Sequence, residues 1–368
     1  MRSYVDGATA IVLGALDAGC DFFAGYPITP ASSILMSLMR DLPRAGGVAV
    51  QGEDEIAAIG MCIGASLAGA RAMTATSGPG MSLYSENLGL AIMGEVPLVV
   101  VDVQRLGPAT GGATTVAQGD VQFVRWGTSG GYPIIALAPS TIGECYTLTM
   151  KAFDLAERFR APVFVMTDKD LNLTMGTVEL DELRPAEVRN RETDHDPATE
   201  YRYEPADGVP PMVRYGRGTP VRFTGSTHDE HAFISKDPAT VGALNRHLID
   251  KIEAHRDEIE MVETDLQDGA DTILISYGST AAAMRSAVRE LRSGGARISS
   301  ATVHSLWPVP ETALSAAIGT SRRVVVAELN PGLYAREIAL IAGHREVLPL
   351  NRIDGEMLTP DEIAGAVA

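Results

Sequence analysis

The chain has 368 residues, of which 45% are hydrophobic and 21% are charged. This length suits two domains with separate cores, and the composition is that of a globular protein rather than a disordered or fibrous one. The formal net charge is −17 and the sequence pI is about 4.8. So acidic a chain lacks the basic surfaces that nucleic acids and anionic membranes require, and we expect neither as a partner.

The cysteines and the amino-terminal residues bear on the cell compartment. Cys20, Cys62 and Cys145 are odd in number, lie far apart and form no C-x-x-C pair. We therefore expect no disulfide framework and no metal or cluster site in this chain. No basic region precedes a long apolar run near the amino terminus, and Asp17 and Asp21 interrupt the nearest apolar stretch. We expect neither export nor membrane insertion, and a reducing cytoplasm as the location.

Residues 1–171 alternate between helical and strand-like patterns. Helical spacing over 8–18 is followed by short, mostly apolar runs, which are typical of parallel strands covered on both faces. We therefore predict a doubly wound α/β domain. Its predicted strands are 22–25, 48–50, 72–76, 98–102, 132–137 and 163–167.

The pattern changes over 172–268 and returns after it. Residues 172–268 are rich in prolines and charges and show little periodicity until a helical pattern over 238–260. We interpret them as an excursion that carries an arm and a helix, and both an arm to a partner subunit and a solvated linker fit its length. Residues 269–368 predict a second, smaller doubly wound α/β domain. Its strands are 272–277, 297–302 and 323–328, and its helices are 281–292 and 311–318.

Candidate site residues are those that follow each predicted strand, because ligands bind beyond the carboxyl ends of parallel strands. The first such segment is Gly-Tyr-Pro-Ile-Thr-Pro at 25–30. Its prolines restrict the backbone and hold the hydroxyl of Thr29 in a rigid turn. An ordinary strand-to-helix connection, with Thr29 as the N-cap and Pro30 in the first turn, explains the motif equally well.

The second segment places the carboxylates Glu53, Asp54 and Glu55 at the start of a helix predicted over 55–70. Glu53 and Asp54 suit a structural role, since acidic groups stabilise the positive end of a helix. A stripe of glycines along the helix implies that another helix or chain packs closely against it, which would bury Glu55 at an interface. The stripe consists of Gly60, Gly64 and Gly69.

The third segment, Thr-Ser-Gly-Pro-Gly at 76–80, resembles an anion-binding turn. Ser77, Gly78 and Gly80 can present backbone N–H groups ahead of a helix that we predict to begin near Met81. The segment lacks the Gly-Lys-Ser/Thr of a P-loop, and it has no G-x-G-x-x-G with a following acidic residue. A nucleotide site is therefore not indicated.

The fourth segment joins Arg105 to a loop over 107–119 that is rich in glycine and threonine. An arginine can bind a carboxylate through two parallel hydrogen bonds, and the loop can bring backbone close to a small ligand. A surface salt bridge is the commoner role of a lone arginine.

Taken together, in this order and spacing, the motifs resemble the alpha chain of the 2-oxoacid:ferredoxin oxidoreductases. Segments 25–30, 55–70 and 76–87 are similar to the pyrimidine-binding domain of that family, which has the thiamine-diphosphate fold. Segment 272–334 is similar to its transketolase-C-terminal-like domain. The Gly-Tyr-Pro-Ile-Thr-Pro motif is the most specific of these matches.

The resemblance implies a role for each candidate residue. It places Glu55 beside the aminopyrimidine of thiamine diphosphate, where a carboxyl bonded to the ring nitrogen favours the tautomer that takes the proton from the thiazolium carbon. Pro27, Ser77 and Gly78 are then expected to contact the cofactor.

By the same resemblance, Thr29 and Arg105 are expected to bind the 2-oxoacid.

The resemblance also shows what the chain lacks. The Mg²⁺-binding motif of thiamine diphosphate enzymes begins Gly-Asp-Gly, and this sequence has no Gly-Asp-Gly. The diphosphate, its Mg²⁺ and a [4Fe-4S] cluster are therefore expected on a smaller beta subunit, from which electrons pass to ferredoxin. We expect the two subunits to form a dimer of heterodimers.

The substrate is expected to be 2-oxoglutarate, converted with coenzyme A and oxidised ferredoxin into succinyl-coenzyme A, carbon dioxide and reduced ferredoxin. Segments 76–80 and 223–230 and the two-domain length resemble the 2-oxoglutarate members most, while pyruvate and branched-chain members remain alternatives. The distal carboxylate of 2-oxoglutarate needs an anchor, which the partner or Arg125 could supply. His228 is either a further anchor or an ordinary loop histidine.

Two other functions are compatible with a retained fold. The beta chain of a lipoamide-linked 2-oxoacid dehydrogenase has the same kind of two domains, but the motif at 25–30 argues against it. A non-catalytic scaffold subunit is the second alternative, because one α/β architecture serves many functions. The presence of Glu55 argues against a scaffold.

Overall fold

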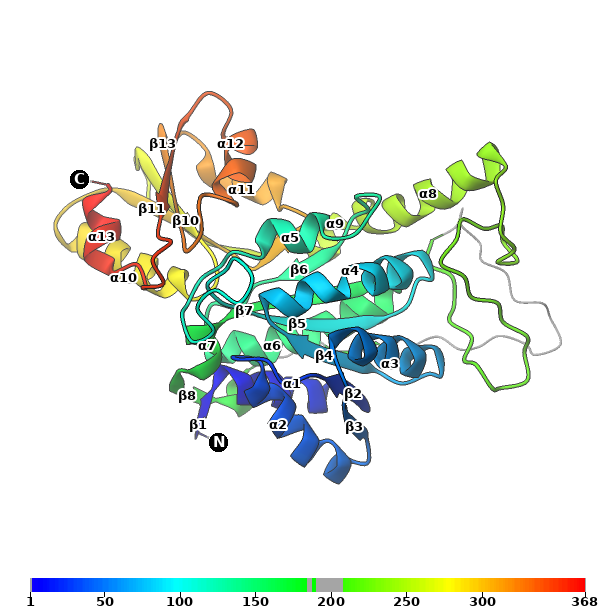
Figure 1. The fold of residues 1–368 in the computed structure, drawn as a ribbon. Helices are drawn as coiled ribbons and strands as arrows, with labels where there is room; N and C mark the ends of the chain where they lie inside the picture. Colours follow the sequence, from blue (N-terminus) through cyan, green and yellow to red (C-terminus); the bar gives the residue numbers. More distant parts are fainter. Residues whose placement is uncertain (1, 184–186, 190–207, 368) are drawn as a thin grey trace.

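Two mostly parallel sheets, each with helices on both faces, account for most of the chain in this computed structural model (Figure 1). The structure describes residues 2–183, 187–189 and 208–367. Part of the predicted excursion over 172–268 lies outside the described residues. The predicted doubly wound α/β fold class is confirmed.

The first sheet has seven strands in the order β12-β6-β7-β5-β4-β2-β3. All neighbours are parallel except β12 and β6, which run antiparallel. The central strands β5 and β7 are buried along their whole length, because helices cover both faces and leave no polar face. The strands are β2 (Phe22–Gly25), β3 (Val48–Gln51), β4 (Ala72–Thr76), β5 (Leu98–Gln104), β6 (Ile135–Leu137), β7 (Pro162–Asp168) and β12 (Ser305–Trp307).

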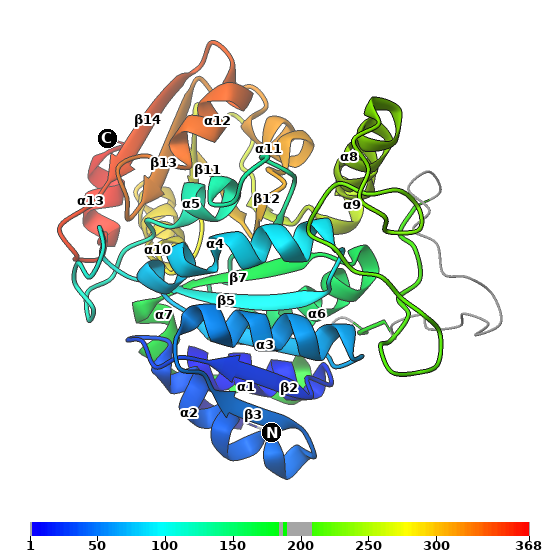
Figure 2. The ribbon, with the colours of Figure 1, turned by 45° about the vertical axis from the view of Figure 1, so that its right-hand side comes forward.

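Three helices lie on each face of this sheet. On one face, the sheet shares a hydrophobic core with α1 (Gly7–Asp17), α2 (Ser32–Asp41) and α6 (Ile142–Phe159). The other face carries α3 (Glu55–Leu67), α4 (Gly78–Met93) and α5 (Val121–Trp126). Figure 2 shows α3 and α4 side by side over the sheet. Asp54 starts α3 by accepting a 2.7 Å hydrogen bond from the backbone N–H of Ala57.

The second sheet has five strands in the order β14-β13-β10-β11-β9. Its helices α10 (Thr280–Ser293) and α13 (Pro360–Gly365) share one core, while α11 (Glu311–Ile318) and α12 (Ala335–Ala342) share a second core with α3 and α4. The two domains therefore have a continuous apolar interface. The strands are β9 (Val262–Asp265), β10 (Thr272–Ser276), β11 (Ile298–Val303), β13 (Arg323–Glu328) and β14 (Glu346–Asn351).

Several short elements were not predicted. The strands β1 (Arg2–Asp6) and β8 (Met175–Glu179) form a separate antiparallel pair. Strand β12 comes from the second half of the chain and extends the first sheet by pairing with β6. The remaining short helices are the 3-10 turns Pro43–Ala45 and Leu180–Glu182, and α7 (Lys169–Leu173).

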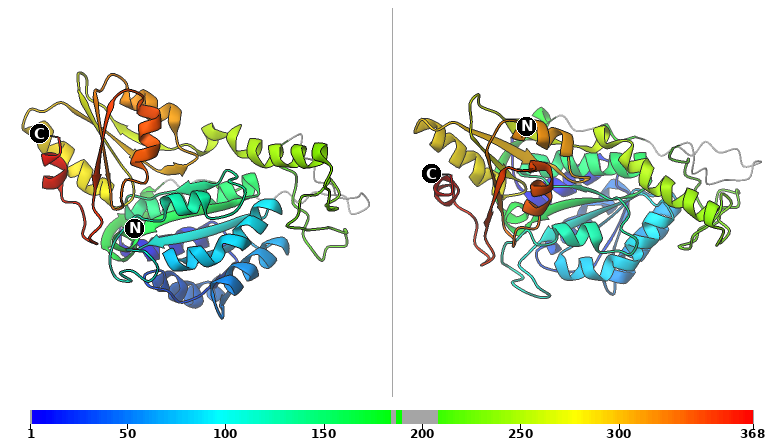
Figure 3. Two further views of the ribbon diagram at one scale, coloured as in Figure 1. Left: turned by 45° about the horizontal axis from the view of Figure 1, so that its top comes forward. Right: turned by 90° about the horizontal axis from the view of Figure 1, so that it is seen from above.

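The described part of the excursion packs on the first domain. The backbone N–H of Tyr215 donates to the carbonyl of Leu67 at the end of α3, and the ring of Phe223 contacts Gly94 at the end of α4. Helices α8 (Pro238–Glu253) and α9 (Arg256–Ile259) then lead back toward the second domain, with α8 extending past the first sheet (Figure 3). Among the described residues, no helix is both long enough and apolar enough to cross a membrane.

Candidate active site

The four candidate segments follow four neighbouring strands of the first sheet. They come after β2, β3, β4 and β5, which are parallel, so all four meet at the same edge. This is the edge where ligands of doubly wound sheets bind. The structure therefore brings the predicted site residues together from separate parts of the sequence.

Glu55 is the first residue of α3 and is 7% exposed, whereas Glu53 and Asp54 are exposed. Its side chain lies against Gly80 on α4: a Cβ added at Gly80 would sit 3.1 Å from Glu55 Oε1. No hydrogen-bond donor to the Glu55 carboxylate is found among the described residues. A buried carboxylate without a donor is unfavourable, so this position suits a ligand that supplies one.

The turn after β4 differs from the prediction in two ways. Helix α4 begins at Gly78 instead of near Met81, so the turn is shorter than expected. The N–H of Gly80 donates to the carbonyl of Ser77 at 2.7 Å, and the interpretation of Gly80 as an open anion donor is therefore wrong. Ser77 occupies the N-cap position without capping the helix, and its buried Oγ has no hydrogen-bond partner among the described residues.

Arg105 is buried and connects two of the loops. Its Nη1 donates to the carbonyl of Thr29 and its Nη2 donates to the carbonyl of Thr110 at 3.2 Å. Its Nε is buried without a partner, and the described residues include no ion pair to Arg105. The alternative of a surface salt bridge is therefore wrong. Carbonyl contacts leave the positive charge unneutralised, so an anion can still bind to it.

Pro27 and Thr29 lie exposed on the loop after β2. Helix α2 begins at Ser32 and its N-cap is Ala31, so the alternative in which Thr29 caps this helix is wrong. Through the Arg105 contact, the loop is fixed at its backbone, which leaves the Thr29 hydroxyl available at the site.

Neither proposed anchor for a distal carboxylate lies at this edge. The Nη1 of Arg125 donates to the carbonyls of Gly131 and Tyr132, and its guanidinium stacks on Trp126 at 4.0 Å. His228 lines a cavity of about 240 Å³ with Glu95 and His247, beyond the carboxyl end of α4. Since α4 has 16 residues, its two ends are separated by about 24 Å.

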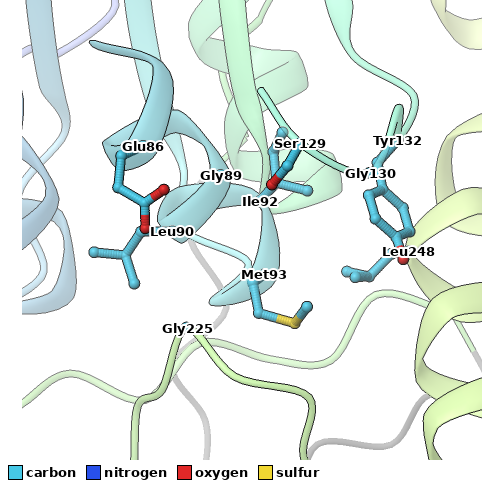
Figure 4. Close-up of a pocket in the computed structure, with 10 residues that line it drawn as sticks. All are labelled: Glu86, Gly89, Leu90, Ile92, Met93, Ser129, Gly130, Tyr132, Gly225 and Leu248. Carbon is cyan, nitrogen blue, oxygen red and sulfur yellow. The ribbon is translucent and has the colours of Figure 1, made fainter. Parts of the chain in front are cut away.

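A second cavity, of about 180 Å³, also lies toward the carboxyl end of α4 (Figure 4). Leu90 and Met93 of α4, with Tyr132 and Leu248, make its lining mostly apolar, and Glu86 is its only charged side chain. Neither cavity includes a predicted site residue.

One cluster of metal-ligating side chains lies elsewhere in the described part of the chain. Glu144, Glu263 and His304 converge between the two domains. The two ring nitrogens of His304 face different carboxylates, at 3.5 Å from Glu144 and 3.7 Å from Glu263, and Arg285 lies 3.9 Å from Glu263. An ion-pair network explains this arrangement better than a metal ion does.

Sequence reasoning missed two acidic residues at the same edge of the sheet. Asp102 lies on β5 and is fully buried, and Asp120 lies at the start of α5 next to Gly78. A signal was present, because Asp102 interrupts the otherwise apolar run Leu-Val-Val-Val-Asp-Val. A charged residue within a fully buried strand is rare unless it has a specific role.

Comparison with known proteins adds family information. The family model described as pyruvate flavodoxin/ferredoxin oxidoreductase, thiamine diphosphate-binding, matches residues 13–246. The model for core domain II of pyruvate:ferredoxin oxidoreductase matches residues 270–363. Together the two matches cover every strand of both sheets except β9.

Individual relatives cover nearly the whole chain. A 2-oxoglutarate synthase subunit KorA from Methanothermobacter thermautotrophicus is 42% identical, over 99% of this chain and 97% of its own length. A ketoisovalerate oxidoreductase subunit VorB from the same organism is 34% identical, over 96% of this chain and 94% of its own.

A solved structure is also similar. It is a 2-oxoglutarate:ferredoxin oxidoreductase from Magnetococcus marinus with 2-oxoglutarate, coenzyme A and succinyl-CoA bound, at a TM-score of 0.93 and 33% identity. The match covers all of this chain, which spans 64% of the length of that one.

Proposed function

Because the chain belongs to the pyruvate flavodoxin/ferredoxin oxidoreductase family, we propose that it is a subunit of a 2-oxoglutarate:ferredoxin oxidoreductase. The reaction converts 2-oxoglutarate, coenzyme A and oxidised ferredoxin into succinyl-coenzyme A, carbon dioxide and reduced ferredoxin. One observation carries this proposal: the largely buried Glu55 side chain has no hydrogen-bond donor among the described residues and lies where four strand ends converge. The family predicted from the sequence motifs is confirmed.

The residues at this edge fit thiamine diphosphate. Glu55 and Ser77 are buried residues without described hydrogen-bond partners, and the missing side chain at Gly80 lets α4 approach Thr76 and Glu55 closely. When bound, the cofactor supplies the carbon nucleophile that attacks the 2-oxoacid. Glu55 would hold a proton against the aminopyrimidine nitrogen, and Pro27 and Gly78 would contact the cofactor.

The same edge offers groups for the 2-oxoacid. Arg105 would attract the substrate carboxylate through its unneutralised positive charge, and the Thr29 hydroxyl would orient the carbonyl. Carbonyls already hold two nitrogens of Arg105, so the guanidinium is fixed before substrate arrives.

We propose that the remaining parts of the enzyme lie on a partner subunit. The chain has no Gly-Asp-Gly motif and its three cysteines are all buried and free, so Mg²⁺ and a [4Fe-4S] cluster would lie on a smaller beta subunit that passes electrons to ferredoxin. Free buried cysteines also support a reducing compartment such as the cytoplasm.

An exposed face of α3 supports this assembly. A Cβ added at Gly60 or Gly64 would meet nothing within 4 Å, and the neighbouring Ile56 is 50% exposed. A smooth, partly apolar helix face of this kind suits close packing by the beta subunit, and we propose a dimer of heterodimers.

The substrate is proposed from the relatives, because neither His228 nor Arg125 lies at the site. The 42% identity to a 2-oxoglutarate synthase subunit favours 2-oxoglutarate over the branched-chain acid of the 34% identical relative. The anchor for the distal carboxylate would then come from the partner subunit.

The test is coenzyme-A-dependent viologen reduction by this chain co-purified with its native partner. We expect 2-oxoglutarate to give the highest kcat/KM among 2-oxoglutarate, pyruvate and 2-oxoisovalerate. Higher activity with pyruvate or 2-oxoisovalerate would identify the chain as a subunit of a different member of the family. A requirement for lipoyl domains would support the lipoamide-linked alternative, and no activity from a cofactor-loaded complex would support the scaffold alternative.

A further inference from the structure

Two buried carboxyl groups meet beneath the start of α4, and neither has a role so far. Asp102 on β5 is 0% exposed and lies opposite Thr76 of β4 in the sheet register. Neither of its oxygens, nor Oδ2 of Asp120, has a hydrogen-bond partner among the described residues if both groups are ionised. Leaving ionised carboxylates buried in this way costs several kcal/mol each, which the fold cannot easily sustain.

The position of Asp120 shows that this contact is built into the fold. Asp120 is the N-cap of α5, a position where aspartate normally accepts a hydrogen bond from its own helix. Asp6, Asp54 and Asp168 all do so at their helices. Asp120 makes no such bond; instead its N–H donates to Gln104, which lies two residues after Asp102 on the same face of β5, and this places the two acidic residues side by side.

The surrounding groups prevent Asp120 from turning away. Its backbone N–H donates to Gln104 Oε1 at 3.1 Å. Two residues earlier, Gln118 is held by the second domain: its N–H donates to the carbonyl of Leu329 at 2.9 Å, and its carbonyl accepts from Asn330 Nδ2 at 2.7 Å. The loop is thus fixed at Asp120 and on its amino-terminal side.

We propose that Asp102 and Asp120 share one proton, and that the resulting acid–carboxylate pair is a positioning element of the active site. Two ionised carboxylates have no hydrogen to share, so the contact becomes a hydrogen bond only when one of them is protonated. A pair with one proton carries a single negative charge. That charge lies against Gly78, where an added Cβ would be 3.4 Å from both oxygens of Asp120.

Arg105 is the charged group whose electrostatic influence reaches Asp120. Glu55 lies on the other side of Gly80 and Thr76, and Asp168, the last residue of β7, faces Gln118 and Ser279 of the domain interface. The pair therefore balances the positive charge of Arg105 without pairing with it directly. Its role in substrate binding rests on the proposed function, whereas the shared proton does not.

The charge of the pair changes in a definite pH range. Burial raises the pKa of Asp120 to about 6, and burial together with the charge of Asp120 raises the pKa of Asp102 well above its ordinary value. At pH values above about 6 the pair keeps one proton. Below this pH the pair takes up a second proton and becomes neutral, which leaves Arg105 more attractive to an anion.

The shared proton can be measured in the assembled complex by infrared spectroscopy, without turnover. At neutral pH we expect the wild type to show the carbonyl band of a protonated carboxylic acid, part of which disappears in both Asp102→Asn and Asp120→Asn. Asp271→Asn, at a side chain that is 81% exposed, is the control and should leave the band unchanged. A band of equal intensity in the wild type and both variants, or no band in the wild type, would overturn the proposal.

The positioning role has a separate readout in the pH profile. As pH falls through about 6, the KM of the wild type for 2-oxoglutarate should fall about three- to tenfold, because the neutral pair no longer offsets Arg105. Asp120→Asn removes the group that titrates near 6, so its KM should not show this change, whereas Asp102→Asn keeps the hydrogen bond and the titrating Asp120 and should follow the wild type. Asp102→Ala should raise KM at every pH.

A KM profile in Asp120→Asn that follows the wild type would refute the positioning role. If the wild type turns over no 2-oxoacid, the proposed function fails, and the infrared comparison still decides whether the proton is shared.

Discussion

The two ends of α4 both bury acidic groups, but only one end supplies partners for them. At the carboxyl end, Glu95 is 1% exposed, and its Oε2 accepts from Lys251 Nζ at 3.0 Å and lies 2.9 Å from His247 Nε2. At the amino end, Glu55 is 7% exposed and Asp102 is 0% exposed, and neither carboxyl group receives a hydrogen bond from the described residues.

The presence or absence of partners distinguishes a buried acidic group with a structural role from one with a functional role. A buried charge that is fully paired fixes one arrangement of the chain, here the attachment of α8 to the first domain. Buried polar groups without partners lower stability and persist where a ligand, a proton or another subunit completes them. We therefore propose the amino end of α4 as the site, whereas the carboxyl end is a structural anchor.

The largest expected effect is the loss of turnover in Glu55→Gln. Removing the group that holds the cofactor proton should lower kcat about 10²- to 10⁴-fold in the co-purified complex. Glu53→Gln changes the exposed carboxylate two residues earlier and should keep wild-type turnover. Full activity in Glu55→Gln would show that the amino end of α4 is not the catalytic site.

At the anchor, Lys251→Met should act on stability. It leaves Glu95 buried without its cation, which costs about 3–5 kcal/mol, and thermal unfolding of the chain should show it. Turnover per folded molecule should not change, because the anchor is about 24 Å from the site. An unchanged melting temperature would show that the ion pair does not hold α8.

The anchor also predicts acid sensitivity. Burial alone would raise the pKa of Glu95, but Lys251, His247 and Arg160 outweigh it and hold the pKa below its ordinary value. A depressed pKa contributes stability that is present above the unfolded-state value and is lost as pH falls toward the folded-state value. In denaturant titrations, the free energy of unfolding of the wild type should therefore decrease as pH falls. That of Lys251→Met should decrease less.

Arg105→Lys should act on substrate binding. Losing a fixed guanidinium contact to a carboxylate costs about 1.5–3 kcal/mol, so KM for the 2-oxoacid should rise about 10- to 100-fold. Arg125→Lys, at the arginine stacked on Trp126, should leave KM unchanged. The opposite pattern would make Arg125 the substrate residue.

The smallest expected effects come from glycines on the two helices. In Gly80→Ala the new Cβ meets Thr76 and Glu55, and overpacking should cost about 1–3 kcal/mol in thermal unfolding. In Gly60→Ala the Cβ meets nothing within the chain, so the isolated chain should gain up to about 1 kcal/mol. Weaker binding of the partner subunit to Gly60→Ala would identify α3 as the interface, and unchanged binding would argue against it.

Much of the fold could be predicted from the sequence because long apolar strands and amphipathic helices have clear periods. Predicted strand 72–76 and helix 311–318 agree with β4 and α11 at both ends. Strand β12 has three residues and exists only because β6 offers it an edge, so no local pattern reveals it.

The candidate site residues could be grouped from the sequence for a similar reason. Glu55, Thr29 and Arg105 follow strands that turned out to be neighbours, and topology alone was enough to group them. Asp120 escaped notice because it looks like an ordinary helix cap, and only its missing cap bond separates it from Asp54. His228 was considered for the site, but its distance depends on the path of the excursion, which composition does not reveal.

The central claim is that Glu55 serves a ligand at some cost to the fold, and the melting temperature of Glu55→Gln tests it most directly. Removing a buried carboxylate that has no donor should leave the melting temperature of the purified chain unchanged or raise it. A clear decrease, of the size expected for Lys251→Met, would mean that Glu55 stabilises the chain and that the contrast between the two ends of α4 is wrong.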